Sequence, residues 1–312
     1  MGGLILTLTL NPAIDRVVSA DRLVFEDRAY ILSTSEAAGG RGLNASCIFH
    51  TFGAPTVAIY PSGGESGVRL EQLLSCCGFP TEVVRIGRPV RTNLIISDQQ
   101  GLTVKLNEAG AGLEGEELER MAEAVEKHLP QSSWLLLCGS LPPGAPPEFY
   151  SRLIRMAQAR GVSVLLDTDG DVLREVVPTG PTVVAPNQQE AERVLNRALI
   201  TRPHFHRAAE KILQMGAGGV ILSLGRRGAV VAHDGRVVEV VPPPVEAVCP
   251  IGAGDALNGA FVWARTQGAD FVDAARWGVA AGTASARLPG VGLASLEQTR
   301  EVYQQVEVRL VR

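Results

Sequence analysis

The chain has 312 residues, of which 46% are hydrophobic and 20% are charged, and its formal net charge is −4. This composition is typical of a globular protein with one large domain or two ordinary ones, and it excludes a disordered chain. The negative charge argues against a nucleic-acid partner, because such binders carry broad positive surfaces, so any phosphate site must be local.

The N-terminal segment has no basic stretch ahead of an apolar one, and no apolar run approaches the ~20 residues that a membrane helix needs. We therefore expect neither a signal peptide nor a membrane partner. The cysteines are odd in number and lack metal-ligand spacing, which indicates reduced thiols in a cytoplasmic protein. They are Cys47, Cys76, Cys77, Cys138 and Cys249.

Short apolar strands alternate with amphipathic helices along most of the chain. Strands are expected at residues 4–10, 56–60, 82–86, 134–138, 162–167, 182–185 and 219–223. Helices are expected after Gly42, after Asp255, and at residues 68–77, 118–129, 148–160, 188–196, 207–215 and 274–286. The dipeptide Asp234-Gly235 predicts a two-residue hairpin turn. This alternation predicts an α/β fold with a mostly parallel sheet and helices on both faces.

Residues 13–35 and 88–106 break the alternation, because both carry β-type residues without an intervening helix. They predict one small antiparallel sheet that forms a lid over the carboxyl edge of the main sheet. We therefore expect a discontinuous β lid of residues 11–35 and 88–106. The α/β domain would comprise residues 1–10, 36–87 and 107–312.

The strongest motif is the glycine-rich turn that leads into the helix at Asp255. Gly252, Ala253 and Gly254 can turn their N–H groups toward one point, and the helix N-terminus adds partial positive charge. Such a turn can stabilise a phosphoryl group in transfer, while Asp255 accepts the proton of an attacking hydroxyl. On this motif alone, an Asp that merely caps the helix is an equally good interpretation.

A second glycine-rich turn, at residues 38–44, precedes the first helix. Its glycines would admit a ligand close to the backbone, and Asn44 could contact vicinal hydroxyls. Asp15 follows the first strand and is a second candidate for hydroxyl binding. The alternatives are a simple loop-to-helix turn and a solvated acid.

Three further polar turns follow strands. Asn187 and Glu190 offer oxygen ligands that suit Mg²⁺ reached through water, although the same spacing forms a capping box, and both interpretations can hold. The turn from Ser223 to Gly228 and the turn that contains Ser140 are weak signals alone. Because ligands of open α/β sheets bind at the carboxyl ends of strands, the turns support one another.

Two nucleotide-binding motifs do not fit. The G-x-G-x-x-G pattern at residues 110–115 is not followed by a strand that ends in an acid, so a dinucleotide-binding fold is disfavoured. The chain contains no G-x-x-x-x-G-K-[ST] sequence, which excludes a P-loop enzyme.

Taken together, these motifs resemble the ribokinase-like carbohydrate kinases over essentially the whole chain, and most closely the branch of 1-phosphofructokinase and tagatose-6-phosphate kinase. The resemblance is carried by the opening T-L-N-P-A-I-D at residues 9–15, the A-G-G-R-G-L-N at 38–44, the G-S-L-P-P-G at 139–144 and the I-G-A-G-D at 251–255. It implies a large α/β nucleotide domain and a β-sheet lid through which two copies form a homodimer.

The resemblance also implies ATP and Mg²⁺ as cofactors and a role for each matching residue. The catalytic group would be Asp255 as base, with Gly252, Ala253 and Gly254 as the anion hole. The substrate would be held by Asp15, Gly39, Gly40, Arg41, Asn44, Arg91, Ser140 and Arg28. The nucleotide would lie along Asn187, Ser223, Gly225 and Gly228, with Glu190 and Asn187 near Mg²⁺.

The implied reaction is the ATP-dependent phosphorylation of a sugar-phosphate hydroxyl. Arg91 matches the position that binds the substrate's own phosphate, and Arg28 is a lid cation that could act across a dimer. The opening motif favours fructose 1-phosphate; tagatose 6-phosphate, fructose 6-phosphate, an unphosphorylated sugar or a nucleoside are alternatives, as is a non-catalytic sensor. Arg41 departs from the family's usual lysine, in a chain with only three lysines.

Overall fold

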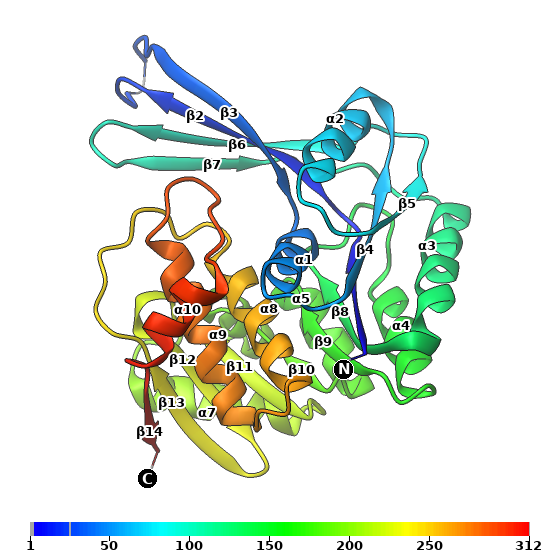
Figure 1. Cartoon of the computed structure of the whole chain (residues 1–312), viewed down its shortest axis with the longest axis vertical. Coiled ribbons are helices and arrows are strands. Elements are labelled where there is room, and N and C mark those ends of the chain that lie inside the picture. The colour runs from blue at the N-terminus through cyan, green and yellow to red at the C-terminus, as the bar shows by residue number, and fades with distance from the viewer. Residues whose placement is uncertain (1–2, 25, 312) are drawn as a thin grey trace.

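The computed structural model describes residues 3–24 and 26–311, which form a large and a small β-sheet (Figure 1). The large sheet has ten strands in the order β14-β13-β12-β11-β10-β9-β8-β1-β4-β5. It is parallel from β5 to β11 and antiparallel from β11 to β14. The strands are β1 Leu4–Thr9, β4 Thr56–Ser62, β5 Thr81–Arg85, β8 Ser132–Cys138, β9 Ser163–Asp167, β10 Val183–Val184, β11 Gly219–Ser223, β12 Ala229–His233, β13 Arg236–Val241 and β14 Glu307–Leu310.

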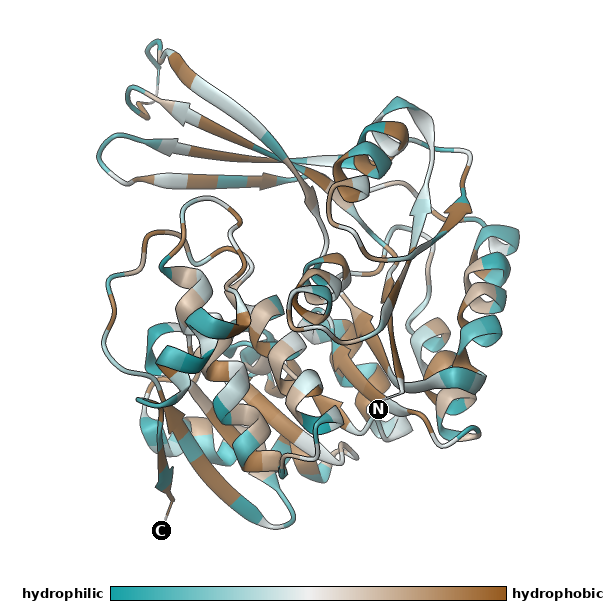
Figure 2. Ribbon diagram, viewed as in Figure 1, coloured by the Kyte–Doolittle hydropathy of each residue, from teal (hydrophilic) through white to brown (hydrophobic). Residues whose placement is uncertain are grey.

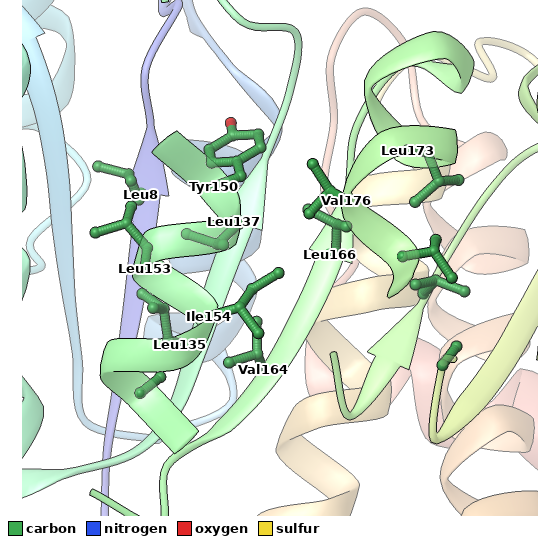
Figure 3. Close-up of a cluster of buried hydrophobic side chains, with 14 of the residues drawn as sticks. Leu8, Leu135, Leu137, Tyr150, Leu153, Ile154, Val164, Leu166, Leu173 and Val176 are labelled. Carbon is green, nitrogen blue, oxygen red and sulfur yellow. The ribbon is translucent and has the colours of Figure 1, made fainter. Parts of the chain in front are cut away.

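Helices cover both faces of this sheet, because its central strands are apolar on both sides (Figure 2). On β8, Leu135 and Leu137 pack beneath α3 to α7, whereas Trp134 and Leu136 face α1, α8 and α9. Figure 3 shows part of the first of these two cores, where α4 and α5 lie over β1, β8 and β9. The helices are α1 Arg41–Thr51, α2 Gly64–Ser75, α3 Gly115–His128, α4 Pro147–Gln158, α5 Gly170–Val176, α6 Gln188–Leu195, α7 Arg202–Gln214, α8 Ala253–Thr266, α9 Phe271–Ala286 and α10 Leu296–Tyr303.

The small sheet contains the strands β2 Ala13–Ala20, β3 Ile31–Gly39, β6 Arg91–Asp98 and β7 Thr103–Asn107, in the order β3-β2-β6-β7. The prediction of a purely antiparallel sheet is wrong at its centre, since β2 and β6 are parallel. The reason is that β2 follows β1 and β6 follows β5 after short connections. Because β1 and β5 run the same way in the large sheet, β2 and β6 leave it in the same direction.

The small sheet is also longer than predicted. β3 continues through Gly39, where it pairs with Ala13, and β7 includes Asn107, which pairs with Asn93. The expected boundaries at 35 and 106 therefore cut inside strands. In Figure 1 the four strands project from the α/β body, and the far part of the sheet lies beyond the helices.

Most expected elements are present, and the hairpin turn is confirmed by positive φ angles at Asp234 (49°) and Gly235 (70°). Three elements were not predicted: α5, α10 and β14. The cysteines are free thiols, as expected. Within residues 3–24 and 26–311, no helix is both long and apolar enough to cross a membrane.

Candidate active site

Two adjoining cavities open at the carboxyl edge of the large sheet, and the N-terminus of α8 lies between them. The first has a volume of about 750 Å³ and the second of about 940 Å³. The first is lined by Asp15, Gly40, Arg41, Asn44, Arg91, Ser140, Gly252 and Asp255, among others. The second is lined by Asn187, Ser223, Gly225, Gly228, Ala253 and Gly254, among others. The strand-end turns singled out in the sequence therefore do converge.

The turn into α8 leaves amide groups available between the cavities. Gly252 adopts a left-handed conformation with φ 80°, which favours glycine, and α8 starts at the next residue. The Ala253 amide donates to the Pro250 carbonyl at 3.3 Å. Within the described chain, the amides of Gly254 and Asp255 have no backbone acceptor. These amides and the helix dipole make this turn a suitable anion site.

Asp255 lies in the first turn of α8, and its side chain faces the first cavity. Its Oδ2 accepts a hydrogen bond from Asn44 Nδ2 at 2.7 Å. The residue ahead of the helix is Gly252, so the interpretation of Asp255 as an N-cap is wrong. Burial, and then the nearby Asp167 carboxylate, raise the pKa of Asp255 to about 7, against the opposing effects of Asn44 and Arg41.

The glycines ahead of α1 allow close packing around Asp15. A Cβ atom on Gly39 would lie 2.5 Å from the Asp15 carboxyl group. Gly40 has φ 139°, a conformation that side chains other than glycine rarely adopt. Asp15 accepts a hydrogen bond from Asn93 Nδ2 at 2.8 Å, and burial raises its pKa. Asp15 and Asn44 are thereby presented together in the first cavity.

Arg41 is held by three carboxylates rather than by one partner. Its guanidinium contacts Asp167 at 2.6 Å, Glu190 at 2.9 Å and Asp169 at 3.4 Å. The second carboxylate oxygen of Asp167 accepts from Asn258 Nδ2 at 2.9 Å. Asp167 raises the pKa of Arg41, which stays protonated. Arg41 lines the first cavity, but most of its hydrogen-bonding capacity is used inside the protein, and its predicted contact with the substrate stays a prediction.

Asn187 and Glu190 form the capping box that was one of the two interpretations of this motif. Asn187 Oδ1 accepts from the Glu190 amide at 3.0 Å, and Glu190 Oε2 accepts from the Asn187 amide at 2.9 Å. The Glu190 side chain is only 5% exposed, and its other oxygen accepts from Arg41. Burial raises the pKa of Glu190. Glu190 lines neither cavity, whereas Asn187 lines the second.

The side-chain oxygens of this capping box are of the kind that Mg²⁺ prefers as ligands. However, Asn187 Oδ1 and both carboxylate oxygens of Glu190 already accept hydrogen bonds within the protein. No group of three or more His, Cys, Asp or Glu side chains in the described residues is arranged to hold a metal ion. The described residues therefore offer no set of direct Mg²⁺ ligands, and a contact with Mg²⁺ through intervening water stays a prediction.

Arg91 reaches the first cavity from β6, while Arg28 does not reach it. Arg91 donates through Nη1 to the Glu108 carbonyl at 2.9 Å and through Nη2 to the Asn11 carbonyl at 2.8 Å. Ser140 Oγ accepts from the Asn11 side chain at 3.2 Å. Arg28 is exposed on the loop between β2 and β3 and lines neither cavity of its own chain.

Several lining residues were not predicted. In the first cavity they include Asn11, Asn93 and Asp169, and in the second they include Arg226 and residues of α9. The buried acid Asp167 also received no role, although its place at the end of an apolar strand was a usable signal. The α9 residues carry no motif, because small apolar side chains are common in any packed helix.

Comparisons with known proteins agree with this geometry. The sequence matches the pfkB family carbohydrate kinases over residues 8–299. It is 32% identical to the ATP-dependent 6-phosphofructokinase isozyme 2 of Escherichia coli, over 96% of this chain and 97% of that protein. It is 25% identical to the 1-phosphofructokinase of Vibrio cholerae, over 97% and 96% of the two chains.

The fold agrees as well. The crystal structure of Escherichia coli phosphofructokinase-2 in complex with potassium superposes with a TM-score of 0.90, at 31% identity, over 97% of this chain and 98% of that one. The expected ribokinase-like α/β fold with a separate small sheet is thereby confirmed. The chain belongs to the pfkB family of carbohydrate kinases, and it is a phosphotransferase that acts on a sugar hydroxyl.

Proposed function

We propose that this kinase transfers the γ-phosphoryl group of ATP to the C1 hydroxyl of fructose 6-phosphate, giving fructose 1,6-bisphosphate and ADP. The 32% identity to the 6-phosphofructokinase isozyme 2 of Escherichia coli, against 25% and 28% to two 1-phosphofructokinases, supports this acceptor over the fructose 1-phosphate that the opening motif favoured, although a second 6-phosphofructokinase is only 27% identical. Fructose 1-phosphate stays the second candidate, because its C6 hydroxyl would give the same bisphosphate product. Tagatose 6-phosphate ranks after it.

The observation that carries the proposal is the place of Asp255 at the junction of the two cavities, beside the first amides of α8. A sugar hydroxyl in the first cavity would give its proton to Asp255 as its oxygen bonds to the γ-phosphorus. The bond from that phosphorus to the leaving ADP oxygen breaks in the same transfer. A base with a pKa near 7 is ionised for a large part of the time at neutral pH and still accepts a proton readily.

The α8 turn would stabilise the negative charge of the phosphoryl group during its transfer. The amides of Gly252, Ala253 and Gly254 are proposed as the anion hole, and the amide of Gly254 is free of backbone partners in the described structure. Such fixed donors need no reorganisation during the reaction, which is why they contribute strongly to catalysis.

The sugar phosphate would be held by groups from both sheets. Asp15 and Asn44 suit hydroxyl groups, and the Gly39-Gly40 turn brings backbone close to the ligand. Arg91, whose buried Nε has no partner within the described residues, is proposed to bind the substrate's phosphate, with Ser140 beside it. Arg41 would contribute positive charge while holding the acidic residues behind it.

The nucleotide would occupy the second cavity. Asn187, Ser223, Gly225 and Gly228 form its polar side, and the apolar side chains of Leu257, Val279 and Pro244 suit an adenine ring. When bound, Mg²⁺ would neutralise phosphate charge. Asn187 and Glu190 would contact it through water.

The free cysteines support a cytoplasmic location for the protein.

The small sheet is proposed as the contact between the two copies of a homodimer. Ile31 and Leu32 at the start of β3 and the preceding Tyr30 are 67%, 53% and 63% exposed, an unusual amount of apolar surface for a monomer. In such a dimer, Arg28 could reach the first cavity of the second copy. An Ile31→Asp variant is expected to sediment as a monomer, whereas a parent that is itself monomeric would refute the contact.

A coupled ADP-release assay with fructose 6-phosphate, fructose 1-phosphate, tagatose 6-phosphate, fructose and a nucleoside tests the acceptor. The highest kcat/KM is expected with fructose 6-phosphate. A non-catalytic sensor would bind sugar phosphates without releasing ADP, and a preference for fructose would refute a phosphorylated substrate.

A further inference from the structure

A pocket of about 250 Å³ with a basic rim lies between the end of α6 and one face of α7. Its rim carries Arg197, His204, Arg207 and Lys211. It shares no lining residue with the two cavities of the active site. No acidic side chain of the described residues lines it, which is unexpected in a chain with 33 acidic and 29 basic residues.

The helix geometry brings these basic side chains together. His204, Arg207 and Lys211 are three and seven residues apart on α7, so they share one face. Arg197 comes from the turn after α6, where Asn196 adopts a left-handed conformation with φ 47° and redirects the chain. Like charges four residues apart on a helix, as at Arg207 and Lys211, destabilise it.

These cations lack the partners that their neighbours have. On the same helix, Arg202 and His206 both contact the carboxylate of Glu239. Within residues 3–24 and 26–311, Arg197, Arg207 and Lys211 take part in no ion pair. This arrangement has an electrostatic cost that a bound anion would remove.

The donors of the rim remain available. His204 Nδ1 accepts from the Ile200 amide at 3.3 Å, which leaves Nε2–H as a donor. Arg207 Nε donates to the Pro203 carbonyl at 3.2 Å, and neither of its Nη groups has a partner among the described residues, so both are available to a ligand. Three or four convergent donors of this kind match the oxygens of a phosphate group.

The floor of the pocket is apolar. Leu199 and Ala208 are 3% and 1% exposed, and the partly buried Leu195 completes this surface. An apolar floor under a cationic rim suits a molecule with a short apolar body and one phosphate group. The small volume excludes a nucleic-acid segment and favours a free small molecule.

We propose that this pocket is a second ligand site, which binds a small organic phosphate through Arg197, His204, Arg207 and Lys211, with its organic part against Leu195 and Leu199. The pocket is close to the nucleotide side of the active site. The Leu199 amide donates to Glu192 at 2.8 Å and its carbonyl accepts from Gln188 at 3.0 Å, and both partners line the second cavity.

Calorimetric titration with phenyl phosphate at low salt tests the proposal. The titration uses an Arg91→Ala background, which removes the phosphate-binding cation proposed for the first cavity, and it is run with and without saturating ADP. We expect one site whose affinity falls by about tenfold or more in Arg207→Gln/Lys211→Gln, because two charged hydrogen-bond donors are lost. The matched control is Arg155→Gln/Arg300→Gln, exposed arginines elsewhere, which should leave binding unchanged.

Two further probes separate the parts of the site. Benzyl alcohol, which lacks the phosphate, should not bind measurably, and inorganic phosphate should bind more weakly than phenyl phosphate. Absence of phenyl phosphate binding, or equal loss in both double variants, would overturn the site. Equal affinity for inorganic phosphate and phenyl phosphate would overturn the role of the apolar floor.

Discussion

Replacing Asp255 by Asn is expected to remove activity and to stabilise the fold, and the second effect depends on pH. The folded structure raises the pKa of this carboxyl group from 3.8 to about 7. Each unit of pKa shift corresponds to about 1.4 kcal/mol, so the shift of roughly three units costs about 4 kcal/mol once the group is ionised in both states.

The sign follows from proton binding. Between pH 4 and 7 the folded state holds a proton at Asp255 that the unfolded state has lost, so rising pH destabilises the fold through this group. Asn cannot ionise, and its side-chain oxygen can still accept the hydrogen bond from Asn44. We therefore expect the variant to unfold with a free energy higher by about 2–4 kcal/mol at pH 8, and the gain to shrink by about 1.4 kcal/mol per unit below pH 7.

Urea unfolding at pH 5, 6, 7 and 8 measures this difference, and steady-state kinetics on the same samples measure catalysis. The variant should lose about 10²–10⁴-fold in kcat. In the parent enzyme, kcat/KM should fall about tenfold per pH unit below pH 7, because only the ionised base is active. A stability difference that is constant from pH 5 to 8 would refute the assigned pKa, and parental turnover would refute the base.

Three further substitutions test other parts of the site. Arg41→Gln leaves Asp167 and Glu190 buried without their cation, so urea unfolding at pH 8 should show a free energy of unfolding lower by about 3 kcal/mol. This loss should shrink at lower pH, where Glu190 takes up a proton, and a loss independent of pH would contradict this explanation. Gly40→Ala forces a strained φ of 139° and should cost about 1–3 kcal/mol, whereas an unchanged melting temperature would contradict the strain. Arg91→Ala should raise KM for the sugar phosphate by about tenfold or more, with little change for an unphosphorylated sugar, and an equal KM in both enzymes would exclude it as the phosphate ligand.

The sequence predicted the location of the site better than its internal contacts. Glycine turns at strand ends are local signals, and the edge rule for α/β sheets brings them together without further information. The bonds of Arg41 are different, because its partners Asp167 and Glu190 lie 126 and 149 residues away in the sequence. A local sequence pattern gives neither the distance from Arg41 to these carboxylates nor their orientation.

The errors in the fold have a similar origin. The α5 and α10 helices have seven and eight residues, too few for a clear helical period. The equally short α6 was found because Asn187 and Glu190 have capping-box spacing, a signal that Ser295 and Gln298 also give ahead of α10 and that was overlooked. The parallel pairing of β2 with β6 depends on how β1 and β5 enter the small sheet. The large sheet therefore sets the direction of β2 and β6. Its strands lie outside the two segments from which the small sheet was predicted.

The small sheet is joined to helix α1 of the α/β body by a single residue. β3 ends at Gly39 and α1 begins at Arg41, so Gly40 alone separates them. The same helix then provides Asn44, which holds the catalytic carboxylate of Asp255. A tilt of the small sheet would move α1 and Asn44 with it, so an event at the outer surface of the sheet would alter proton transfer at Asp255 through a single side-chain hydrogen bond.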